Sequence, residues 1–244
     1  MLGGLILDNL SFSGEDASNY LEVFLQKLTD SGIDINNKAD FKKGIFKLFN
    51  IELYNMPDLD SKDYILASNH VSDFDAIILG LLHDKIRILS KKEWVENKKL
   101  MSFVLNYYDL IGVNRNSSGD MTKALINLNK YFKNVTSPKH VLIFPQGTIS
   151  DINNNSIDRI YNGIFSLSYL TQTTILPIFL EQPSMTDKTR IVFGKELLID
   201  NKEDHRNEWI KELKILQKKL DPPPRPPKLS HKHLNNNKIG EPFF

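Results

Sequence analysis

The sequence of 244 residues contains no cysteine. Disulfide bonds, thiolate metal sites and a cysteine nucleophile are therefore excluded, and the composition fits a reducing compartment such as the cytoplasm. An excess of charge of either sign is also lacking, since 31 basic residues stand against 30 acidic ones. Many nucleic-acid-binding proteins carry a strong basic field, so we expect no nucleic acid partner, and any preference for anions must be local.

Long hydrophobic runs are absent too. The longest one beyond the N-terminal segment is AIILGLL, residues 76–82, whereas a helix needs about 20 apolar residues to cross a bilayer. The N-terminal segment MLGGLILDNLSFSGED has no positively charged part before its short apolar run, so we expect no secretory signal. The prediction is a cytoplasmic protein without a membrane-spanning helix, whose membrane contact is peripheral and on the cytoplasmic face.

What the sequence does contain is a regular alternation of β-branched runs and helical patterns, which at this length favours one α/β domain. Helical patterns lie near residues 73–83, 98–106, 119–133, 158–171 and 202–220. The alternation predicts a mixed, largely parallel sheet flanked by helices. The candidate strands are IELY, YILAS, IRILS, YDLIGV, HVLIF, TTILPIFL and RIVF.

Two further helical patterns, ASNYLEVFLQKLTD and ADFKKGIFKLFN, come before the first strand. We therefore predict an N-terminal helical pair over residues 1–50, a domain over 51–220, and a flexible tail over 221–244 that begins with DPPPRPP. In the second helix lysines alternate with apolar residues. Such a helix either lies at an anionic membrane surface or packs on the sheet with its lysines in solvent. The apolar residues are Phe41, Ile45, Phe46, Leu48 and Phe49.

The stretch NHVSDFD, residues 69–75, joins a predicted strand to a predicted helix. Five helical residues turn through about 500°, so His70 and Asp75 can meet only if the helix begins between them. One explanation involves no chemistry: Ser72 and Asp75 form an S-x-x-D capping box. In the other, the carboxylate fixes the imidazole tautomer and leaves the second nitrogen to accept a proton from a substrate. These seven residues leave both open.

Two later segments also place polar residues just after strands. YDLIGVNRNSSGD puts Arg115 beyond a strand, where a guanidinium can bind phosphate or carboxylate through two parallel hydrogen bonds. HVLIFPQGTIS ends a strand at Pro145 and continues with Gln146, Gly147 and Thr148. Proline stops the ladder and glycine lets a ligand approach the backbone, so a rigid substrate-binding turn is expected.

A last apolar strand, TILPIFL, carries Pro177 inside it, which predicts an edge strand or a bulged one. The ordered set of N-H-x4-D, G-x-x-R, F-P-x-G-T and this strand resembles the glycerolipid acyltransferase family, whose best-known members are the lysophosphatidic acid acyltransferases. The resemblance covers residues 51–196. It implies that residues 51–220 form an acyltransferase domain.

In the family that the chain resembles, the histidine of the first motif is the general base and the aspartate orients it. The resemblance gives these roles to His70 and Asp75. It implies that Arg115 contacts an acceptor phosphate and that Pro177 shapes the acyl site. The substrate-binding candidates together are Asn69, Ser72, Lys91, Lys92, Arg115, Pro145, Gln146, Gly147, Thr148 and Pro177.

The chain departs from the family pattern at three positions. Gln146 and Ile149 stand where F-P-E-G-T-R has glutamate and arginine, and Asn162 stands where a basic residue often precedes the glycine. Two cationic contacts to a phosphate are thus missing, each of which contributes about 1.5 to 3 kcal/mol. Either other cations compensate or the acceptor carries no phosphate. The compensating candidates are Arg115, Arg159, Lys91 and Lys92.

The resemblance implies transfer of a fatty acyl group from an acyl-carrier protein or coenzyme A thioester to an acceptor hydroxyl, as on the lysophospholipid 1-acylglycerol-3-phosphate. No metal and no cofactor other than this acyl donor are expected. His70 takes the proton, and backbone donors near the helix start or the Gly147 turn hold the oxyanion. Two alternatives stay open. One is an acyltransferase for a sugar, amine or natural-product acceptor, and the other is a lipid-binding homologue with weakened catalysis.

Overall fold

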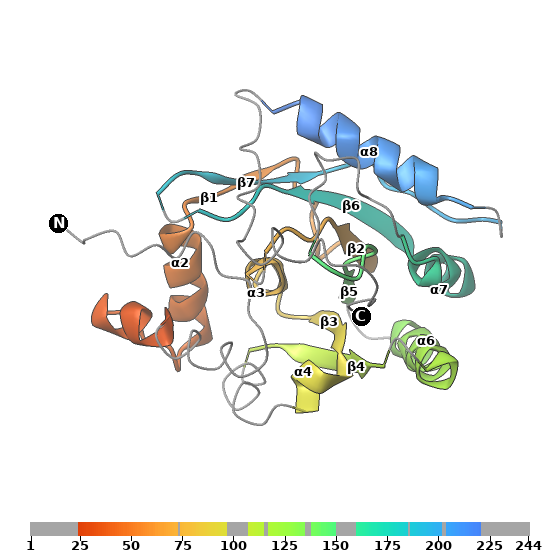
Figure 1. Cartoon of the computed structure of the whole chain (residues 1–244), viewed down its shortest axis with the longest axis horizontal. Coiled ribbons are helices and arrows are strands. Elements are labelled where there is room, and N and C mark those ends of the chain that lie inside the picture. Colours follow the sequence, from red (N-terminus) through yellow and green to blue (C-terminus); the bar gives the residue numbers. More distant parts are fainter. Residues whose placement is uncertain are drawn as a thin grey trace, which may run out of the picture.

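The computed structural model describes residues 24–72, 74–96, 107–114, 117–134, 138–149, 160–184, 186–201 and 204–220. Seven strands form one sheet in the order β1-β7-β6-β2-β5-β3-β4 (Figure 1). Only β6 and β7 pair antiparallel, and all other neighbours are parallel. The predicted mixed, largely parallel sheet is confirmed. The strands are β1 (Ile51–Tyr54), β2 (Tyr64–Ser68), β3 (Ile86–Lys91), β4 (Asp109–Val113), β5 (His140–Ile143), β6 (Thr174–Leu180) and β7 (Thr189–Phe193).

Helices cover both faces of this sheet (Figure 1). Alternate residues of each strand point to opposite faces, so Leu66 of β2 belongs to one hydrophobic cluster and Ile65 to the other. The Leu66 cluster packs against α2 (Lys38–Leu48) and α3 (Asp75–Gly80). The Ile65 cluster packs against α6 (Ser118–Lys133), α7 (Gly163–Thr171) and α8 (Arg206–Lys218). One further short helix, α4 (Lys92–Glu96), follows β3 directly.

Hydrogen bonds at the helix ends explain several boundaries. The Asn37 side chain accepts from the backbone N–H groups of Ala39 and Asp40 at the start of α2, and Ser117 does the same for Asp120 at the start of α6. At the other end of α6, the buried Lys139 ammonium donates to three backbone carbonyls, including that of Tyr131 at 2.7 Å. This lysine precedes β5 directly, so it fixes the end of α6 to the sheet.

The N-terminal helical pattern packs into the core where the structure describes it. Residues 24–30 are helical, and Phe24 contacts Phe74 with ring centroids 5.1 Å apart. Phe41 and Ile45 of α2 are fully buried, and Phe49 is nearly so. Phe46 and Leu48 are partly buried and pack against the same core. The apolar side chains that could have entered a membrane surface therefore pack wholly or partly inside the protein, while Lys43 and Lys47 are exposed.

The seven predicted strands all form, with ends within one residue of those predicted. The helix expected near 73–83 is shorter, from Asp75 to Gly80, and the N–H groups of Val71 and Ser72 before it bond to the Asp75 side chain. The helices expected near 158–171 and 202–220 begin at Gly163 and Arg206. The helix expected near 98–106 and the tail over 221–244 lie outside the described residues.

Pro177 lies in an interior strand, so the edge-strand alternative is wrong. β6 pairs with β2 on one side and β7 on the other. Between the pairings Ile178↔Phe193 and Ile175↔Leu197, β6 has two residues, whereas the segment opposite it has three, residues 194–196. Pro177 lies in this bulged interval, and its carbonyl accepts from the N–H of Gly194 at 2.8 Å. The missing proline N–H falls where the ladder is already interrupted.

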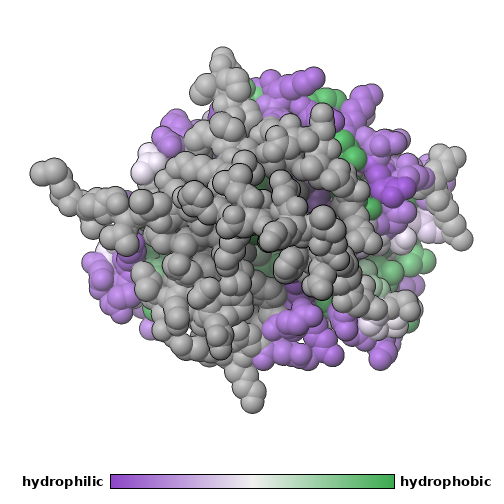
Figure 2. All heavy atoms as spheres, in the orientation of Figure 1, coloured by the Kyte–Doolittle hydropathy of each residue, from purple (hydrophilic) through white to green (hydrophobic). Residues whose placement is uncertain are grey.

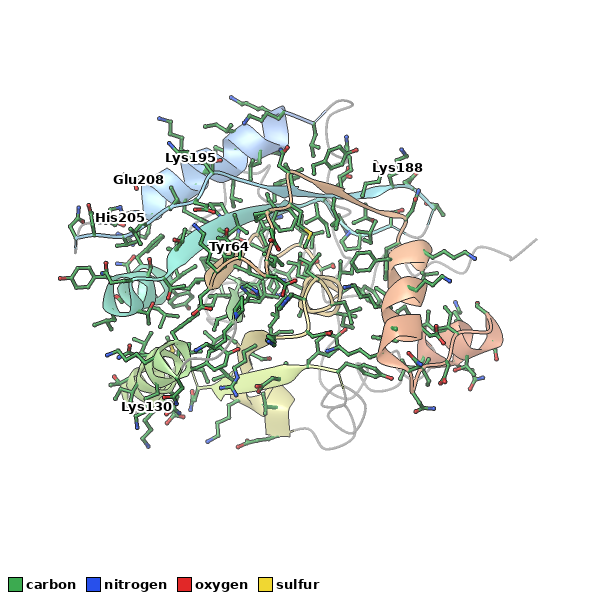
Figure 3. All side chains as sticks on the ribbon, turned by 180° about the vertical axis from the view of Figure 1, so that it is seen from behind. Tyr64, Lys130, Lys188, Lys195, His205 and Glu208 are labelled. Atoms are coloured by element: carbon green, nitrogen blue, oxygen red, sulfur yellow. The ribbon has the colours of Figure 1, made fainter. Side chains whose placement is uncertain are left out.

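The described surface is mostly polar. Figure 2 shows hydrophilic residues over most of the coloured surface on that side, with green areas that are small and separate. In Figure 3, Tyr64 lies in the interior of the molecule, while His205 and Glu208 lie at the start of α8, where they share a hydrogen bond of 2.9 Å. None of the described helices is long and apolar enough to span a bilayer. The exposed large apolar residues are Leu53, Tyr54, Ile126, Leu170 and Leu198.

Candidate active site

The carboxyl ends of the parallel strands β2, β5 and β3 lie at one edge of the sheet. Leu142 of β5 pairs with both Leu66 of β2 and Ile88 of β3. Three residues further along these chains lie Pro145, Asn69 and Lys91, which are therefore at the same level of the sheet. The structure thus brings the first and third motifs together, although they are about 75 residues apart in the sequence.

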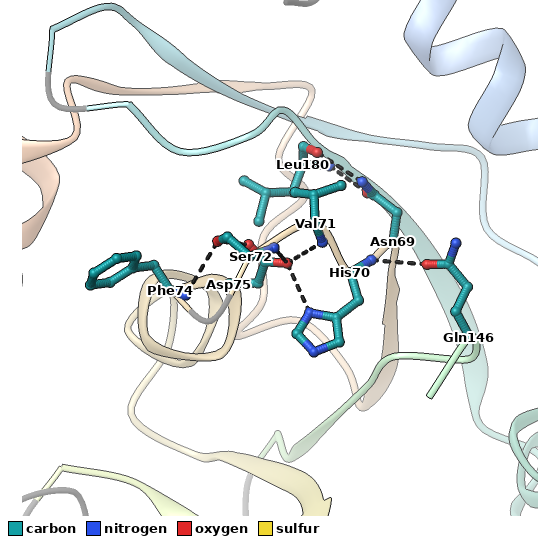
Figure 4. Close-up of polar contacts among 8 residues, drawn as sticks. All are labelled: Asn69, His70, Val71, Ser72, Phe74, Asp75, Gln146 and Leu180. Atoms are coloured by element: carbon teal, nitrogen blue, oxygen red, sulfur yellow. Dashed lines mark hydrogen bonds and ion pairs between the residues drawn. The ribbon is translucent and has the colours of Figure 1, made fainter. Parts of the chain in front are cut away.

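His70 and Asp75 face each other at this edge (Figure 4). The Nδ1 atom of His70 lies 3.0 Å from Oδ2 of Asp75. The Asp75 carboxylate is fully buried, whereas the His70 side chain is 20% exposed. An ionised carboxylate can only accept, so Nδ1 carries the proton and Nε2 presents a lone pair. No described residue bonds to Nε2, so this nitrogen can accept a proton from a bound molecule.

Asp75 also organises the turn between β2 and α3. Its Oδ2 atom accepts from the backbone N–H groups of Val71 at 2.6 Å and Ser72 at 2.9 Å, and Oδ1 accepts from the Ser72 hydroxyl. The Ser72 hydroxyl in turn accepts from the N–H of Phe74. The helix therefore begins after Phe74 and not after Ser72 as predicted. The Asp75 carboxylate organises this turn and also bonds the imidazole, so its geometry fits both the capping explanation and the chemical one.

The turn after β5 supports His70 from its other side. The His70 ring stacks on the Phe144 ring, with centroids 4.4 Å apart and planes tilted by 23°. Gln146 is 3% exposed, and its Oε1 atom accepts from the His70 backbone N–H at 2.9 Å. The turn closes through a bond from Gly147 N–H to the Phe144 carbonyl. Gly147 has φ 72°, a left-handed conformation that glycine adopts without strain.

Comparison with known proteins identifies the family. The family model described as Acyltransferase matches residues 50–181, which is more than half of the chain. The chain belongs to the acyltransferase family. Among solved structures, the chain is similar to the 1-acyl-sn-glycerophosphate (LPA) acyltransferase PlsC from Thermotoga maritima, with 14% sequence identity, a TM-score of 0.49, and coverage of 76% of this chain and 81% of that one. No curated protein matches this chain.

The other predicted site residues of this acyltransferase lie at varied distances from the pair. Asn69 is buried and bonds through both side-chain heteroatoms to the Leu180 backbone, at 2.7 and 2.8 Å. Its amide therefore joins β2 to β6. Lys91 ends β3 at the site edge, and Lys92 begins α4 with its ammonium 3.6 Å from Glu96.

The other positions singled out in the sequence differ in where they lie. Thr148 is exposed beside the turn and Ile149 is half-buried. Pro177 is buried, and strand alternation puts it with Ile175 on the face covered by α7 and α8, away from Asp75. Arg115 and Arg159 lie outside the described residues.

The backbone donors that were expected to hold an oxyanion are occupied in this acyltransferase. At the start of α3, the N–H groups of Val71 and Ser72 both bond to Asp75, and that of Phe74 bonds to the Ser72 hydroxyl. The Gly147 N–H bonds to the Phe144 carbonyl. These four donors are already paired, so the oxyanion contact expected near the helix start or the Gly147 turn stays a prediction.

Sequence reasoning missed three contributors to the site. Phe144 was assigned only to a strand. It is the phenylalanine of F-P-x-G-T, and its position at the end of that strand could have suggested a ring contact with His70. Glu181 and Arg190 form a buried ion pair beside Leu180, with two N–O distances of 3.0 Å. No local pattern reveals that pair, since Glu181 follows β6 and Arg190 lies in β7. Among the residues described, no three His, Asp or Glu side chains are grouped to hold a metal ion.

Proposed function

We propose that this acyltransferase moves a fatty acyl group from an acyl-carrier protein or coenzyme A thioester to the hydroxyl of a lysophospholipid such as 1-acylglycerol-3-phosphate. The observation that carries the proposal is the hydrogen bond between His70 Nδ1 and the buried Asp75 carboxylate, which leaves Nε2 directed to the partly exposed side. The choice of a lysophospholipid rests on the resemblance of the ordered motifs.

In this proposal His70 acts as a general base. Its Nε2 atom takes the proton from the acceptor hydroxyl as that oxygen attacks the thioester carbonyl carbon. The carbon–sulfur bond then breaks, and the departing thiolate takes the proton back from the imidazolium. The new ester and a free thiol result, with no covalent enzyme intermediate and no metal. Asp75 stabilises the imidazolium, because three N–H groups hold its carboxylate beside the ring. The donors are His70 Nδ1 and the backbone N–H groups of Val71 and Ser72.

The acceptor contacts fall to residues around the turn after β5 and the end of β3. Thr148 is exposed beside this turn and offers a hydroxyl to the acceptor. Lys91 lies at the same edge of the sheet. We assign the acceptor phosphate to Arg115 together with Lys91 or Lys92, because a charge-assisted hydrogen bond contributes about 1.5 to 3 kcal/mol. The Lys92 ammonium also lies 3.6 Å from the Glu96 carboxylate, and Lys91 ends β3 at the site edge.

A second candidate function has a specific observation in its favour. Ile149 and Asn162 stand where the family pattern has cationic residues, and neither can carry a positive charge. An acyltransferase whose acceptor is a sugar, an amine or a natural product without a phosphate would need neither cation. The retained His70 and Asp75 pair argues against the third alternative, a lipid-binding homologue with weakened catalysis.

A thioester-release assay separates these functions. Acyl-carrier-protein and coenzyme A donors are tested against phosphorylated and unphosphorylated acceptors, with the wild type, His70→Ala and a control, His83→Ala, which changes a histidine at the opposite sheet edge. We expect acceptor-dependent release that His70→Ala lowers by about 10² to 10⁴-fold and the control leaves intact. Release that persists in His70→Ala would falsify the mechanism, and a preference for unphosphorylated acceptors would select the second function.

We further propose that the enzyme acts at the cytoplasmic face of a membrane, held by exposed lysines of α2. Lys43 and Lys47 face solvent, whereas the buried Phe41 and Ile45 anchor the helix to the protein. Charge-reversed Lys43→Glu/Lys47→Glu should bind anionic vesicles more weakly in a flotation assay, because each lysine near such a surface contributes about 1 kcal/mol. Equal flotation of the wild type and this variant would show that these lysines do not hold the enzyme at the membrane.

A further inference from the structure

The backbone of His70 lies just beyond the regular sheet. The β2–β5 ladder ends at Ala67↔Ile143, and the β2–β6 ladder ends at Ser68↔Ile178. Backbone N–H groups that are kept from water need a partner, because leaving one unpaired costs about 1 to 3 kcal/mol. Since both ladders of β2 end before the partly buried His70, its peptide group must be held by something else.

Two side-chain amides continue the ladders at this point (Figure 4). On the β5 side, Gln146 Oε1 accepts the His70 N–H at 2.9 Å. On the β6 side, Asn69 both donates to the carbonyl and accepts from the N–H of Leu180. Gln146 and Asn69 are 3% and 0% exposed. The peptide that carries the imidazole is therefore fixed from both neighbouring strands.

The same turn also fixes the ring. Phe144 stacks on the imidazole, and two residues later Gln146 binds the peptide of the same histidine. The turn itself is held by the Gly147 to Phe144 bond and by the Tyr161 N–H, which donates to the Pro145 carbonyl at 2.9 Å. A shift of the Gln146 acceptor would therefore move the His70 backbone relative to both Phe144 and Asp75.

We infer that Gln146 is a positioning residue that acts on the His70 peptide and does not contact the acceptor. This inference rests on the proposed function, in which His70 is the base. The bond requires only an oxygen acceptor, so a glutamine serves as well as a glutamate would. The neutral amide has a second consequence, because it leaves Asp75 as the one carboxylate bonded to His70. The departure from F-P-E-G-T-R at this position then says nothing about whether the acceptor carries a phosphate.

Two variants separate positioning from acceptor binding. Gln146→Met keeps the length of the side chain and removes the acceptor, whereas Gln146→Glu keeps an acceptor oxygen. For Gln146→Met we expect kcat to fall about tenfold or more with the acceptor KM changed less than about threefold, because misplacement of a reacting group lowers kcat. Gln146→Glu should restore most of kcat. Gln26→Met, the same exchange on an exposed side chain, is the control.

Two measurements do not depend on turnover. By NMR, exchange of the His70 amide proton should be about tenfold or more faster in Gln146→Met than in the wild type and the control. In Gln146→Glu, which keeps an acceptor oxygen, the exchange rate should stay within about threefold of that of the wild type. If Gln146→Met does not fold, Gln146→Asn, whose shorter side chain withdraws the acceptor oxygen, is measured in its place.

The outcomes are distinct. An acceptor KM that rises about tenfold in Gln146→Met with kcat unchanged would make Gln146 an acceptor-binding residue. His70 amide exchange that is unchanged in Gln146→Met, or as fast in Gln146→Glu as in Gln146→Met, would also overturn the inference. If the wild type shows no acyl transfer with any donor and acceptor, the proposed function fails, but the exchange results still decide whether Gln146 holds His70.

Discussion

The buried histidine at the amino end of β5 makes stability depend on pH. His140 is fully buried, its ring stacks on Tyr64 with centroids 5.9 Å apart, and the edge of His83 lies against it at 4.7 Å. Neither ring nitrogen has a hydrogen-bond partner of good geometry within the described chain. Burial, with a smaller contribution from His83, lowers the pKa of His140 from 6.5 to about 4, against the opposing effects of the Leu59 backbone and the Asp60 carboxylate.

The direction of the effect follows from proton linkage. Between pH 6.5 and 4 the unfolded chain protonates His140 while the folded protein does not, so unfolding takes up a proton. The stability that depends on a neutral His140 is fully present above pH 6.5 and is lost as the pH falls toward 4. From these two pKa values, the loss between pH 7 and pH 5 is about 2 kcal/mol, and it approaches about 3 kcal/mol below pH 4.

The test compares the wild type with His140→Phe, which keeps a planar ring that cannot titrate. Urea unfolding at pH 7 and at pH 5 gives the free energy of unfolding of each protein. Between the two pH values the wild type should lose about 2 kcal/mol more than the variant. Comparing the pH dependence of each protein removes the packing cost of the substitution. His140→Gln, which is smaller, checks that the difference does not depend on ring size.

A different result would refute the reasoning. If the wild type and both variants lose the same free energy of unfolding between pH 7 and pH 5, within about 0.5 kcal/mol, His140 does not resist protonation in the folded protein. If His140→Phe loses more than the wild type, the sign is wrong, and a partner of the protonated ring must stabilise the fold.

Three further predictions concern the site edge. Asp75→Asn should lower kcat by about 10²-fold or more with an unshifted far-ultraviolet circular dichroism spectrum, because the amide cannot stabilise the imidazolium of His70; normal steady-state kinetics would contradict this. Gly147→Ala should lower the free energy of unfolding by about 1 to 2 kcal/mol in urea titrations, since φ is 72° there, and an unchanged midpoint would show that the turn relaxes. Arg190→Met should cost about 3 to 5 kcal/mol because it removes the guanidinium paired with the buried Glu181 carboxylate, and adding Glu181→Met should recover much of that loss. A double variant whose loss equals the sum of the two single losses would count against a coupled pair.

Local sequence determined the elements of this protein and the order of its motifs. Strands such as YILAS and HVLIF are short runs rich in β-branched and apolar residues, and their period is set by neighbouring residues alone. The His70 and Asp75 pair could be predicted for the same reason, since both residues belong to one seven-residue segment whose turn is built by the Asp75 carboxylate.

Only the tertiary structure decided how that pair is held and what surrounds it. The partner of the His70 peptide is Gln146, 76 residues away, and the partner of Asn69 is Leu180, 111 residues away. Pro177 entered an interior strand because the chain opposite it is bulged there. These contacts depend on strand order and register, which are fixed when the two faces of the sheet are buried together, and no local period encodes them.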